Sequence, residues 1–385
     1  MVPHPSRYNP ALMSAAGLPT IGVDLRALVP EATGIGVYTL SLLRALMERG
    51  EARFLGLAHK APLTASELAA IGVPWEAAWA PLGVLWQQLR LPKRLSAGDI
   101  DLFWSPLSIL PAYCPVPAVV TVHDLTVWLF PETHTVKVRA SQLPFIGRTL
   151  ARADRIIAIS EATARDLARY FPDCAPRVKV IYNGVDEVFT PGREEEIAAT
   201  RRELGCPEGY ILYSGTLEPR KNLGLLLDAW EILRQRGTAL PLLLAGPYGW
   251  GSEGLLKRLE ALAPLGVRHL GRLDRPRQVR VMQAASAFAY PSRYEGFGLP
   301  PAEAMACGVP TVVSESSSLP EVVGEAGLQV AIDDAPGLAE ALGRLLRDPI
   351  FARELGRAGL ERSRRFRWRQ TAAETAALFA ELLAR

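Results

Sequence analysis

The chain has 385 residues, which is more than one domain of ordinary size, and 49% of them are apolar, enough for two cores. A formal net charge of +3 at pH 7 is too small to indicate a nucleic-acid-binding protein. No apolar stretch approaches the ~18 residues of a membrane span, and residues 1–19 lack the apolar core of a signal peptide. The four cysteines show neither paired nor metal-ligand spacing, so a reducing, cytoplasmic location is expected.

Short β-branched runs alternate with helical patterns along the whole chain, which predicts an α/β protein with parallel sheets. Strands are expected at 20–23, 53–57, 118–122, 155–159 and 178–181, and then at 210–214, 241–245, 267–270, 287–290, 311–313 and 328–330. Turn-forming residues from Asn183 to Gly192 predict the connection between the halves. We therefore expect two doubly wound Rossmann-like domains, 1–187 and 188–365, facing a central cleft with the ligand at the carboxyl ends of both sheets.

A glycine motif follows the first expected strand. Gly34 and Gly36 predict a tight turn into a helix, as in a dinucleotide-binding fingerprint. Thr39 stands where the third glycine is expected, and no acidic residue follows at the usual distance of about 20 positions. The motif alone therefore does not predict dinucleotide binding.

His123 and Asp124 come directly after the strand expected at 118–122. Since a single histidine is most often structural, this residue alone predicts no catalysis, and Asp124 is expected to hold the local turn. The next strand is followed by Ser160, which is predicted to be the N-cap of a helix from Glu161 to Tyr170.

A stronger signal runs from Ser214 to Leu223. It combines a strand, a turn at Gly215 and a helix start, with Arg220 and Lys221 side by side. Two adjacent cations near a helix N-terminus oppose the helix dipole, and such a local conflict is often functional. Arginine can clamp phosphate oxygens while lysine supplies a point charge, so the pair predicts a bound anion.

The most informative segment extends from Pro291 to Pro310. A glycine-rich turn leads into a helix whose first turn can hold Pro300 and Pro301, and this arrangement presents backbone N–H groups to an anion. Glu295 on the turn and Glu303 in the helix indicate that sugar or ribose hydroxyls bind beside it. A strand–helix junction with solvated carboxylates is the alternative interpretation.

Five arginines cluster near the C-terminus, at positions 362, 364, 365, 367 and 369, with Phe366 and Trp368 between them. The favoured interpretation is a solvated helix start. The second is contact with an anionic membrane surface or a lipid phosphate.

The segments GTLEPRKNL, YEGFGLPPAEAMACGVP and SSLPEVVG resemble those of the retaining glycosyltransferases of family 4, which have the GT-B fold, and in particular the bacterial mannosyltransferases that use GDP-mannose. The resemblance implies that Glu295 and the turn after it hold the hexose and that Glu303 binds the ribose. It implies that Arg220 and Lys221 bind the diphosphate, that Gly36 approaches it from the other domain, and that His123 hydrogen-bonds sugar hydroxyls. The donor site implied in this way consists of Gly36, Gly215, Arg220, Lys221, Glu295, Gly296, Phe297, Gly298, Leu299 and Glu303, and the catalytic residues of His123, Glu295, Arg220 and Lys221.

The function implied by the resemblance is transfer of a hexose, mannose, from a nucleotide-diphosphate sugar to a saccharide or lipid-linked acceptor in cell-surface polysaccharide synthesis, at the inner face of the membrane. No cofactor or metal is expected, because no Asp-x-Asp pattern lies beside a glycine-rich turn. The resemblance also implies that a C-terminal helix, 366–385, crosses back to the first domain. Trp104 departs from the pattern, since relatives often have a histidine there, and we expect this to bear on the acceptor.

Two other functions are kept as alternatives. One is an NDP-sugar 2-epimerase with the same two-domain shape, although the GTLEPRKNL segment disfavours it. The other is a catalytically silent protein that binds a sugar nucleotide.

Overall fold

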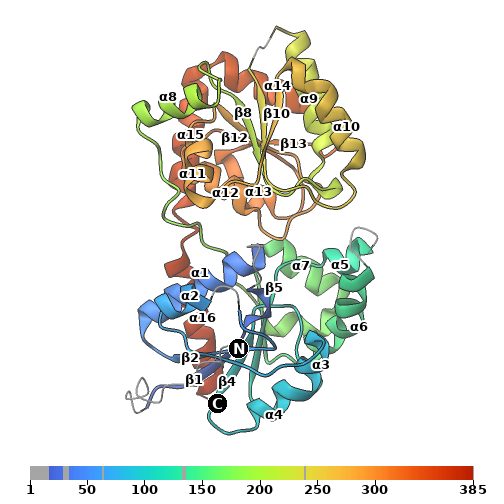
Figure 1. Ribbon diagram of the computed structural model, residues 1–385, viewed down its shortest axis with the longest axis vertical. Coiled ribbons are helices and arrows are strands. Elements are labelled where there is room, and N and C mark those ends of the chain that lie inside the picture. Colours follow the sequence, from blue (N-terminus) through green and yellow to red (C-terminus); the bar gives the residue numbers. More distant parts are fainter. Residues whose placement is uncertain (1–16, 29–33, 63–64, 132–135, 238–239, 385) are drawn as a thin grey trace, which may run out of the picture. The chain divides into compact units, whose positions relative to one another are not determined.

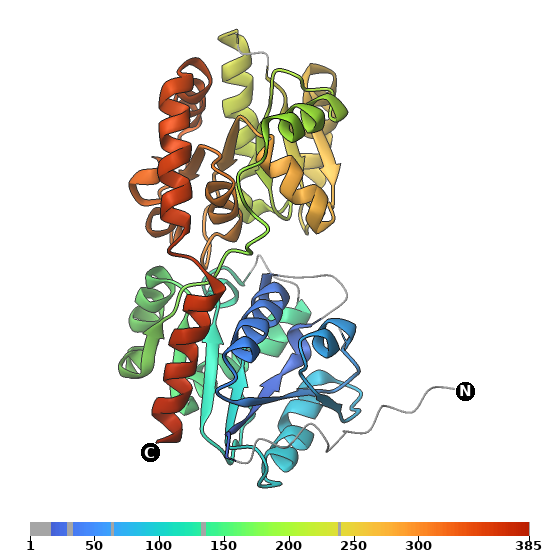
Figure 2. The ribbon, with the colours of Figure 1, turned by 90° about the vertical axis from the view of Figure 1, so that its left-hand side faces the viewer.

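The structure is a computed structural model that describes residues 17–28, 34–62, 65–131, 136–237 and 240–384 (Figure 1). It forms two compact units, one of residues 1–184 with 368–385 and one of residues 185–367. Each unit contains a parallel sheet with helices on both sides (Figures 1 and 2). The N-terminal residues 1–16, part of the stretch tested for a signal peptide, lie outside the described ranges.

The sheet of the first unit has the order β3-β2-β1-β4-β5-β6-β7, the arrangement of a doubly wound fold. Both faces are covered, so β1, β4 and β5 are buried along their whole length and consist of apolar runs rather than alternating patterns. In sequence order the strands are β1 (Thr20–Asp24), β2 (Arg53–Ala58), β3 (Trp75–Ala77), β4 (Leu102–Ser105), β5 (Ala118–Val122), β6 (Arg155–Ala158) and β7 (Val178–Val180).

The helices of the first unit include a continuous segment, α3–η3–α4, in which η3 is a π-helical turn. Ser160 caps α7 as predicted, because its Oγ accepts a hydrogen bond from the N–H of Thr163 at 3.0 Å. The helices are α1 (Gly34–Arg49), α2 (Ala65–Ala70), α3 (Gly83–Leu85), η3 (Trp86–Arg90), α4 (Leu91–Leu95), α5 (Thr126–Leu129), α6 (Val136–Arg152), α7 (Glu161–Tyr170) and α16 (Trp368–Leu383), with 3-10 turns η2 (Leu25–Ala27) and η5 (Pro172–Arg177).

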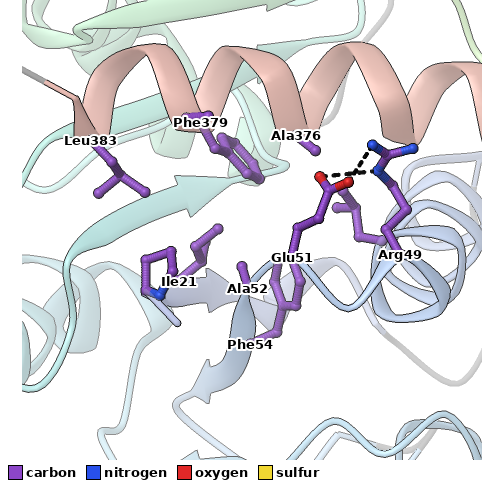
Figure 3. A pocket seen from close by; sticks show the side chains of 11 residues that line it. Ile21, Arg49, Glu51, Ala52, Phe54, Ala376, Phe379 and Leu383 are labelled. Atoms are coloured by element: carbon purple, nitrogen blue, oxygen red, sulfur yellow. Dashed lines mark hydrogen bonds and ion pairs between the residues drawn. The ribbon is translucent and has the colours of Figure 1, made fainter. Parts of the chain in front are cut away.

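The C-terminal helix α16 packs against α1 in this first unit. Figure 3 shows Phe379 and Leu383 of α16 directed toward Ile21 and Phe54, near the amino ends of β1 and β2. A cavity of about 60 Å³ remains among these side chains, with the Arg49–Glu51 ion pair at its border. It lies at the amino edge of the sheet, where ligands of α/β proteins do not usually bind.

The second unit repeats the same winding, with the strand order β10-β9-β8-β11-β12-β13. Its strands are β8 (Ile211–Ser214), β9 (Leu242–Ala245), β10 (Val267–Gly271), β11 (Ala287–Tyr290), β12 (Thr311–Ser314) and β13 (Leu328–Val330). Its helices are α8 (Glu194–Glu203), α9 (Leu223–Gln235), α10 (Glu253–Leu262), α11 (Arg275–Gln283), α12 (Leu299–Ala306), α13 (Leu319–Val323), α14 (Ala335–Arg347) and α15 (Pro349–Ser363), with 3-10 turns η6 (Pro219–Lys221), η7 (Ala263–Leu265) and η8 (Gly324–Ala326).

The predicted fold class, two doubly wound α/β sheets, is confirmed, and the predicted strands differ from the observed ones by a residue or so at their ends. Strands β3 and β4 are missing from the expected set, and the three residues of β3 are too few to show a period. None of the helices in the described ranges is both long enough and apolar enough to cross a lipid bilayer.

Two local predictions need correction. Trp104 is completely buried in β4, where its indole N–H donates to Thr121 Oγ1 at 3.1 Å, so its side chain belongs to the core rather than to an acceptor surface. The arginine cluster is a solvated helix start only in part: Arg364, Arg365, Arg367 and Arg369 are exposed around the start of α16 at Trp368, but Arg362 is not. Arg362 lies in the last turn of α15 and donates to the carbonyl oxygens of Glu321 and Val322, each at 2.6 Å.

Candidate active site

The strongest concentration of charged side chains from the predicted site lies at the carboxyl edge of the second unit's sheet. The chain leaves β8 and β11, the two central neighbours, in opposite winding directions, which makes this edge the topological switch point of the unit. The loop after β8 carries Arg220 and Lys221, and the loop after β11 carries Glu295. A backbone hydrogen bond joins the loops, from the N–H of Arg293 to the carbonyl of Arg220 at 2.9 Å.

Arg220 and Lys221 converge on the carboxylate of Glu295. Lys221 Nζ lies 2.6 Å from Glu295 Oε1, and Arg220 Nη1 lies 3.3 Å from Glu295 Oε2. Arg220 also pairs with Glu218 at 2.6 Å, and Lys221 donates to the hydroxyl of Tyr290 at 3.0 Å. The predicted anion beside the two cations is therefore, in this structure, a pair of carboxylates.

The position of the two cations differs from the prediction in one respect. They end the 3-10 turn η6, and α9 begins after them at Leu223. Asn222 separates the two elements in the left-handed conformation, at φ 56°, which asparagine tolerates better than most residues. The cations are thus held just before the helix rather than inside its first turn.

The ion pair controls the charge of Glu295. Burial alone would raise the pKa of this carboxyl, but Lys221 and Arg220 together lower the pKa to about 2. Burial lowers the pKa of Lys221, and Glu295 opposes that shift. At neutral pH the cluster therefore holds a carboxylate whose ionisation depends on the two cations.

The turn that follows Glu295 is held by two serines. Ser317 Oγ accepts a hydrogen bond from the N–H of Glu295 at 2.7 Å, and Ser318 Oγ donates to the carbonyls of Glu295 and Phe297 at 2.9 and 2.7 Å. Gly298 closes the turn at φ 105°, where a Cβ would come within 2.8 Å of Leu319. This fixes the backbone of Gly296, Phe297 and Gly298 immediately before α12 begins at Leu299, with Pro300 and Pro301 in its first turn as predicted.

Gly215 occupies the start of the neighbouring loop. It follows β8 directly and donates its N–H to the carbonyl of Ala245 at 2.9 Å. A Cβ on Gly246 in the next loop would come within 2.0 Å of the Gly215 carbonyl oxygen, so the two backbones approach too closely for side chains. Gly215 thus belongs to the same sheet edge as the cation cluster.

Glu303 forms a separate group on α12. Its carboxylate accepts from Arg275 at 3.0 Å and from Gln278 at 3.3 Å, and its side chain is 7% exposed. Burial raises the pKa of Glu303 to about 7, although Arg275 opposes the shift. Arg275 also pairs with Asp186 at 3.2 Å and lies over the ring of Phe189, in the segment that enters the unit.

The first unit carries the two remaining predicted residues, Gly36 and His123. Gly36 is buried in the first turn of α1, and His123 follows β5. Tyr38 of α1 meets the His123 ring edge-on, with centroids 4.8 Å apart, so both residues lie near one another at the carboxyl edge of this sheet. The neighbouring Asp124 accepts from the N–H of Thr126 at 2.8 Å, which confirms its expected structural role.

The surroundings of His123 fix its tautomer. Its Nε2 lies 2.8 Å from the carbonyl oxygen of Pro106, which can only accept, so Nε2 carries the proton and Nδ1 can accept. Burial lowers the pKa of His123, so the ring is neutral at physiological pH. This histidine can exchange hydrogen bonds but does not supply positive charge.

Several residues of the site were not predicted. Glu218, Tyr290 and Arg275 all contact predicted residues. Nothing in the local sequence sets Tyr290 or Arg275 apart, whereas Glu218 lies in the GTLEPRKNL segment and could have been found. Ser317 and Ser318 could have been found, because they begin the SSLPEVVG segment. Within the described ranges, no group of three or more His, Cys, Asp and Glu side chains is arranged to hold a metal ion.

Comparison with known proteins covers both halves of the chain. A model of the family described as Glycosyltransferase Family 4 matches residues 32–189, and a model of Glycosyl transferases group 1 matches residues 196–362. The O-antigen chain mannosyltransferase B of Escherichia coli is 34% identical over 262 residues, which are 67% of this chain and 68% of that protein. The D-inositol 3-phosphate glycosyltransferase of Saccharomonospora viridis is 32% identical over 251 residues, which are 62% of this chain and 58% of that protein.

Solved structures match the fold over almost the entire chain. The crystal structure of Anabaena HepE in complex with UDP and glucose superposes with a TM-score of 0.75 and covers 94% of this chain and 100% of that one. At 21% sequence identity, this likeness concerns the fold alone. With both family models and the Escherichia coli relative, it leads to the conclusion that the chain is a glycosyltransferase of group 1 and family 4, with the GT-B fold.

Proposed function

We propose that the enzyme transfers mannose from GDP-mannose to a saccharide or lipid-linked acceptor, with retention of anomeric configuration, in the cytoplasm at the site of cell-surface polysaccharide synthesis. The observation that carries this proposal is the convergence of Arg220, Lys221 and Glu295 at the switch point of the second unit. We assign the nucleotide sugar to the domain of residues 188–365. The acceptor is assigned to the domain of residues 1–187, together with the helical segment 366–385.

The charges of the cluster suit the departure of a nucleoside diphosphate. Breaking the anomeric C–O bond leaves an oxocarbenium-like sugar and concentrates negative charge on the leaving phosphate. Cations that are already in place stabilise that charge without reorganisation. Lys221 has three N–H donors, and its two named partners are Glu295 and Tyr290, so one donor remains for a phosphate oxygen.

The remaining residues divide between sugar and nucleotide. Glu295 and the backbone of Phe297 and Gly298 would hold the hexose, and His123 would exchange hydrogen bonds with its hydroxyls through Nδ1. Glu303 would accept from the ribose hydroxyls. A glycoside hydrolase needs an acid and a nucleophilic carboxyl flanking one glycosidic bond. Glu295 is instead paired with Lys221 and Arg220, whereas Glu303 forms a separate group with Arg275, which argues against a hydrolase.

The choice of mannose and GDP rests on the relatives. The Escherichia coli protein with 34% identity is a mannosyltransferase by name, and it supports this donor. The UDP complex of HepE supports a nucleotide-diphosphate sugar of another kind, and the D-inositol 3-phosphate glycosyltransferase shows that relatives are not all mannosyltransferases by name. The donor is therefore tested by thermal stabilisation with a panel of sugar nucleotides, since a ligand that binds the folded protein raises its melting temperature.

The reaction itself is tested by incubating the protein with GDP-mannose, in EDTA, and following free GDP and the sugar product. Release of GDP with the α configuration kept in the product is the expected result. Inversion at C2 of the hexose would instead identify an epimerase, and binding without turnover would identify a silent sugar-nucleotide-binding protein. Activity that is lost in EDTA and restored by magnesium or manganese would contradict metal-free transfer.

A further inference from the structure

The α3–η3–α4 segment of the first unit, with the loop before it, exposes a row of large apolar side chains. Trp79 and Leu89 are 71% and 67% exposed, more than any other large apolar side chain in the described ranges. Leu82 and Leu85, between them in sequence, are 61% and 40% exposed. Single exposed apolar residues are ordinary, but a contiguous group marks a surface with a partner.

The segment is amphipathic and firmly anchored by its other face. Leu82, Leu85 and Leu89 are spaced by three and four residues, so they share one side of the helical segment. On the opposite side, Leu91 and Leu95 are buried in the core, and Trp86, at the edge of the exposed row, is buried as well. The exposed row is therefore a built feature and not a frayed loop.

Contacts of Arg26 hold the same segment in place on its buried side. Arg26 donates to the carbonyl of Gly83 at 3.3 Å, and its guanidinium lies 5.3 Å from the centre of the Trp86 ring. Asp24 holds Arg26 in place through paired contacts at 2.5 and 3.0 Å. The π-helical turn that begins at Trp86 widens the helix here, and such turns are frequent at functional sites.

The charge around the apolar row is positive. No acidic residue occurs between Glu76 and Asp99, whereas Arg90, Lys93 and Arg94 lie in this interval. Arg94 pairs with both flanking carboxylates, at 2.6 Å each, and the charges of residues 76–99 together sum to +1. The exposed side chains of Arg90 and Lys93 leave a net positive border on the apolar row.

A second aromatic side chain lies beside the segment. The N–H of Ala112 donates to Gln88 Oε1 at 2.7 Å, which places the next residue, Tyr113, next to η3. Tyr113 is 61% exposed. Tryptophan and tyrosine are the side chains most enriched at the boundary between lipid headgroups and hydrocarbon.

We propose that this surface, formed by Trp79, Leu82, Leu85, Leu89, Arg90 and Lys93 and called here the 79–93 surface, docks onto an anionic lipid bilayer. The apolar row enters the boundary between headgroups and acyl chains, while the two cations face lipid phosphates. A short amphipathic element with a basic border favours this occupant over a protein surface because an anionic bilayer satisfies both its apolar area and its charge.

The arginine cluster at 362–369 is a weaker candidate for the same role. Phe366, within it, is only 3% exposed, and Arg362 is bound to backbone carbonyls of its own unit. That segment offers charge without exposed apolar side chains to insert. The 79–93 surface offers both.

Co-sedimentation with vesicles tests the proposal on the full chain. The protein should bind vesicles of phosphatidylcholine mixed with an equal amount of phosphatidylglycerol, and bind pure phosphatidylcholine much more weakly. The double variant Leu82→Gln/Leu89→Gln should lower the partition coefficient by on the order of tenfold or more. Ile350→Gln, which removes an apolar side chain 64% exposed on α15 of the second unit, should leave it unchanged.

Charge is tested in the same way. Arg90→Gln/Lys93→Gln should weaken binding to the anionic vesicles, while the matched variant Arg365→Gln/Arg367→Gln should not. Brominated lipids should quench part of the tryptophan fluorescence, and Trp79→Phe should remove that part. Unfolding temperatures of all variants confirm that they remain folded.

Three results would overturn the proposal. One is equal vesicle binding by the wild type and the two leucine and charge variants. Another is loss of binding in the Arg365→Gln/Arg367→Gln variant alone. The third is a dimer in solution that Leu82→Gln/Leu89→Gln dissociates, with no vesicle binding by any form, since that would make the surface a protein interface.

Discussion

At the scale of single residues, the buried contact between Lys221 and Glu295 is the best-defined interaction of the candidate site. Each side chain is about a tenth exposed or less, at 8% and 10%. Removing one partner of a buried pair leaves an uncompensated charge, at a cost of about 3–5 kcal/mol. We expect Lys221→Met and Glu295→Gln each to destabilise the protein strongly and the double variant to be less damaged than the sum of the two.

The measurement is a double-mutant cycle on the free energy of unfolding. A coupling of more than about 1 kcal/mol is expected for the buried pair. The exposed pair Arg293 and Asp333, joined at 2.8 Å, serves as the control and should give a coupling of about 0–1 kcal/mol. Purely additive effects at Lys221 and Glu295 would show that the two charges do not depend on each other.

Glu303 gives a prediction about pH. Its pKa is raised from 4.5 to about 7 in the folded protein, so the folded state keeps the proton longer than the unfolded state does. The contribution of the protonated Glu303 carboxyl to the free energy of unfolding is full below pH 4.5 and is lost as pH rises through about 7. Glu303→Gln cannot lose a proton, so relative to the wild type it should gain roughly 3 kcal/mol across that window.

This difference is measured as the unfolding free energy of wild type and variant between pH 4 and 8, and the exposed Glu354→Gln is the control. A difference in unfolding free energy that stays the same at all pH values would show that the pKa of Glu303 is not shifted.

The assignment of Glu303 to the ribose gives a separate prediction. Glu303→Ala should weaken binding of donor and nucleoside diphosphate alike, by about 1.5–3 kcal/mol for a hydrogen bond to a charged group.

His123 is predicted to act as a neutral hydrogen-bonding group. Because burial lowers its pKa from 6.5, turnover should show no step as pH falls through 6.5. His123→Ala should reduce turnover far more than affinity for nucleoside diphosphate, which has no hexose for the ring to contact. Steady-state kinetics and calorimetry measure the two quantities, and equal losses in both would make His123 a structural residue.

At the scale of elements, the turn between β11 and α12 gives the clearest prediction. Gly298→Ala forces a side chain into φ 105° and against Leu319, so a loss of about 1–3 kcal/mol in stability is expected. Turnover should fall more than affinity for nucleoside diphosphate, because the turn positions Glu295, which is assigned to the hexose. Gly224→Ala, in helix α9 with nothing within 4 Å of the added Cβ, should instead be neutral or stabilising by up to about 1 kcal/mol.

The same turn explains how much of the site could be predicted from the sequence. Glycines, prolines and carboxylates between Pro291 and Pro310 lie on one strand–turn–helix unit, so local chemistry was enough to find them. Arg275 could not be found in this way, because it meets Glu303 across 28 residues from a different helix, and only the packing of α11 beside α12 creates the contact. The expectation that Trp104 bears on the acceptor failed for a related reason, since the burial of a side chain depends on which elements cover its strand.

At the scale of the whole molecule, both units have the same kind of sheet topology. Each is a parallel sheet wound outward from a central pair of strands, and each carries its predicted site residues at the carboxyl edge of that sheet. This part was predictable, because alternation of strand and helix patterns limits the topology to a few arrangements. The partners of the charged residues are tertiary contacts, which such patterns do not specify.

The central claim, that Arg220 and Lys221 bind the diphosphate of a sugar nucleotide without a metal, is tested most directly by calorimetry in EDTA with GDP and GMP. The wild type should bind GDP at least about tenfold more tightly than GMP, because the second phosphate meets two fixed cations. Arg220→Gln and Lys221→Met should remove most of that difference and leave GMP binding nearly unchanged. Equal affinities of the wild type for the two nucleotides, or an undiminished preference for GDP in both variants, would contradict the assignment.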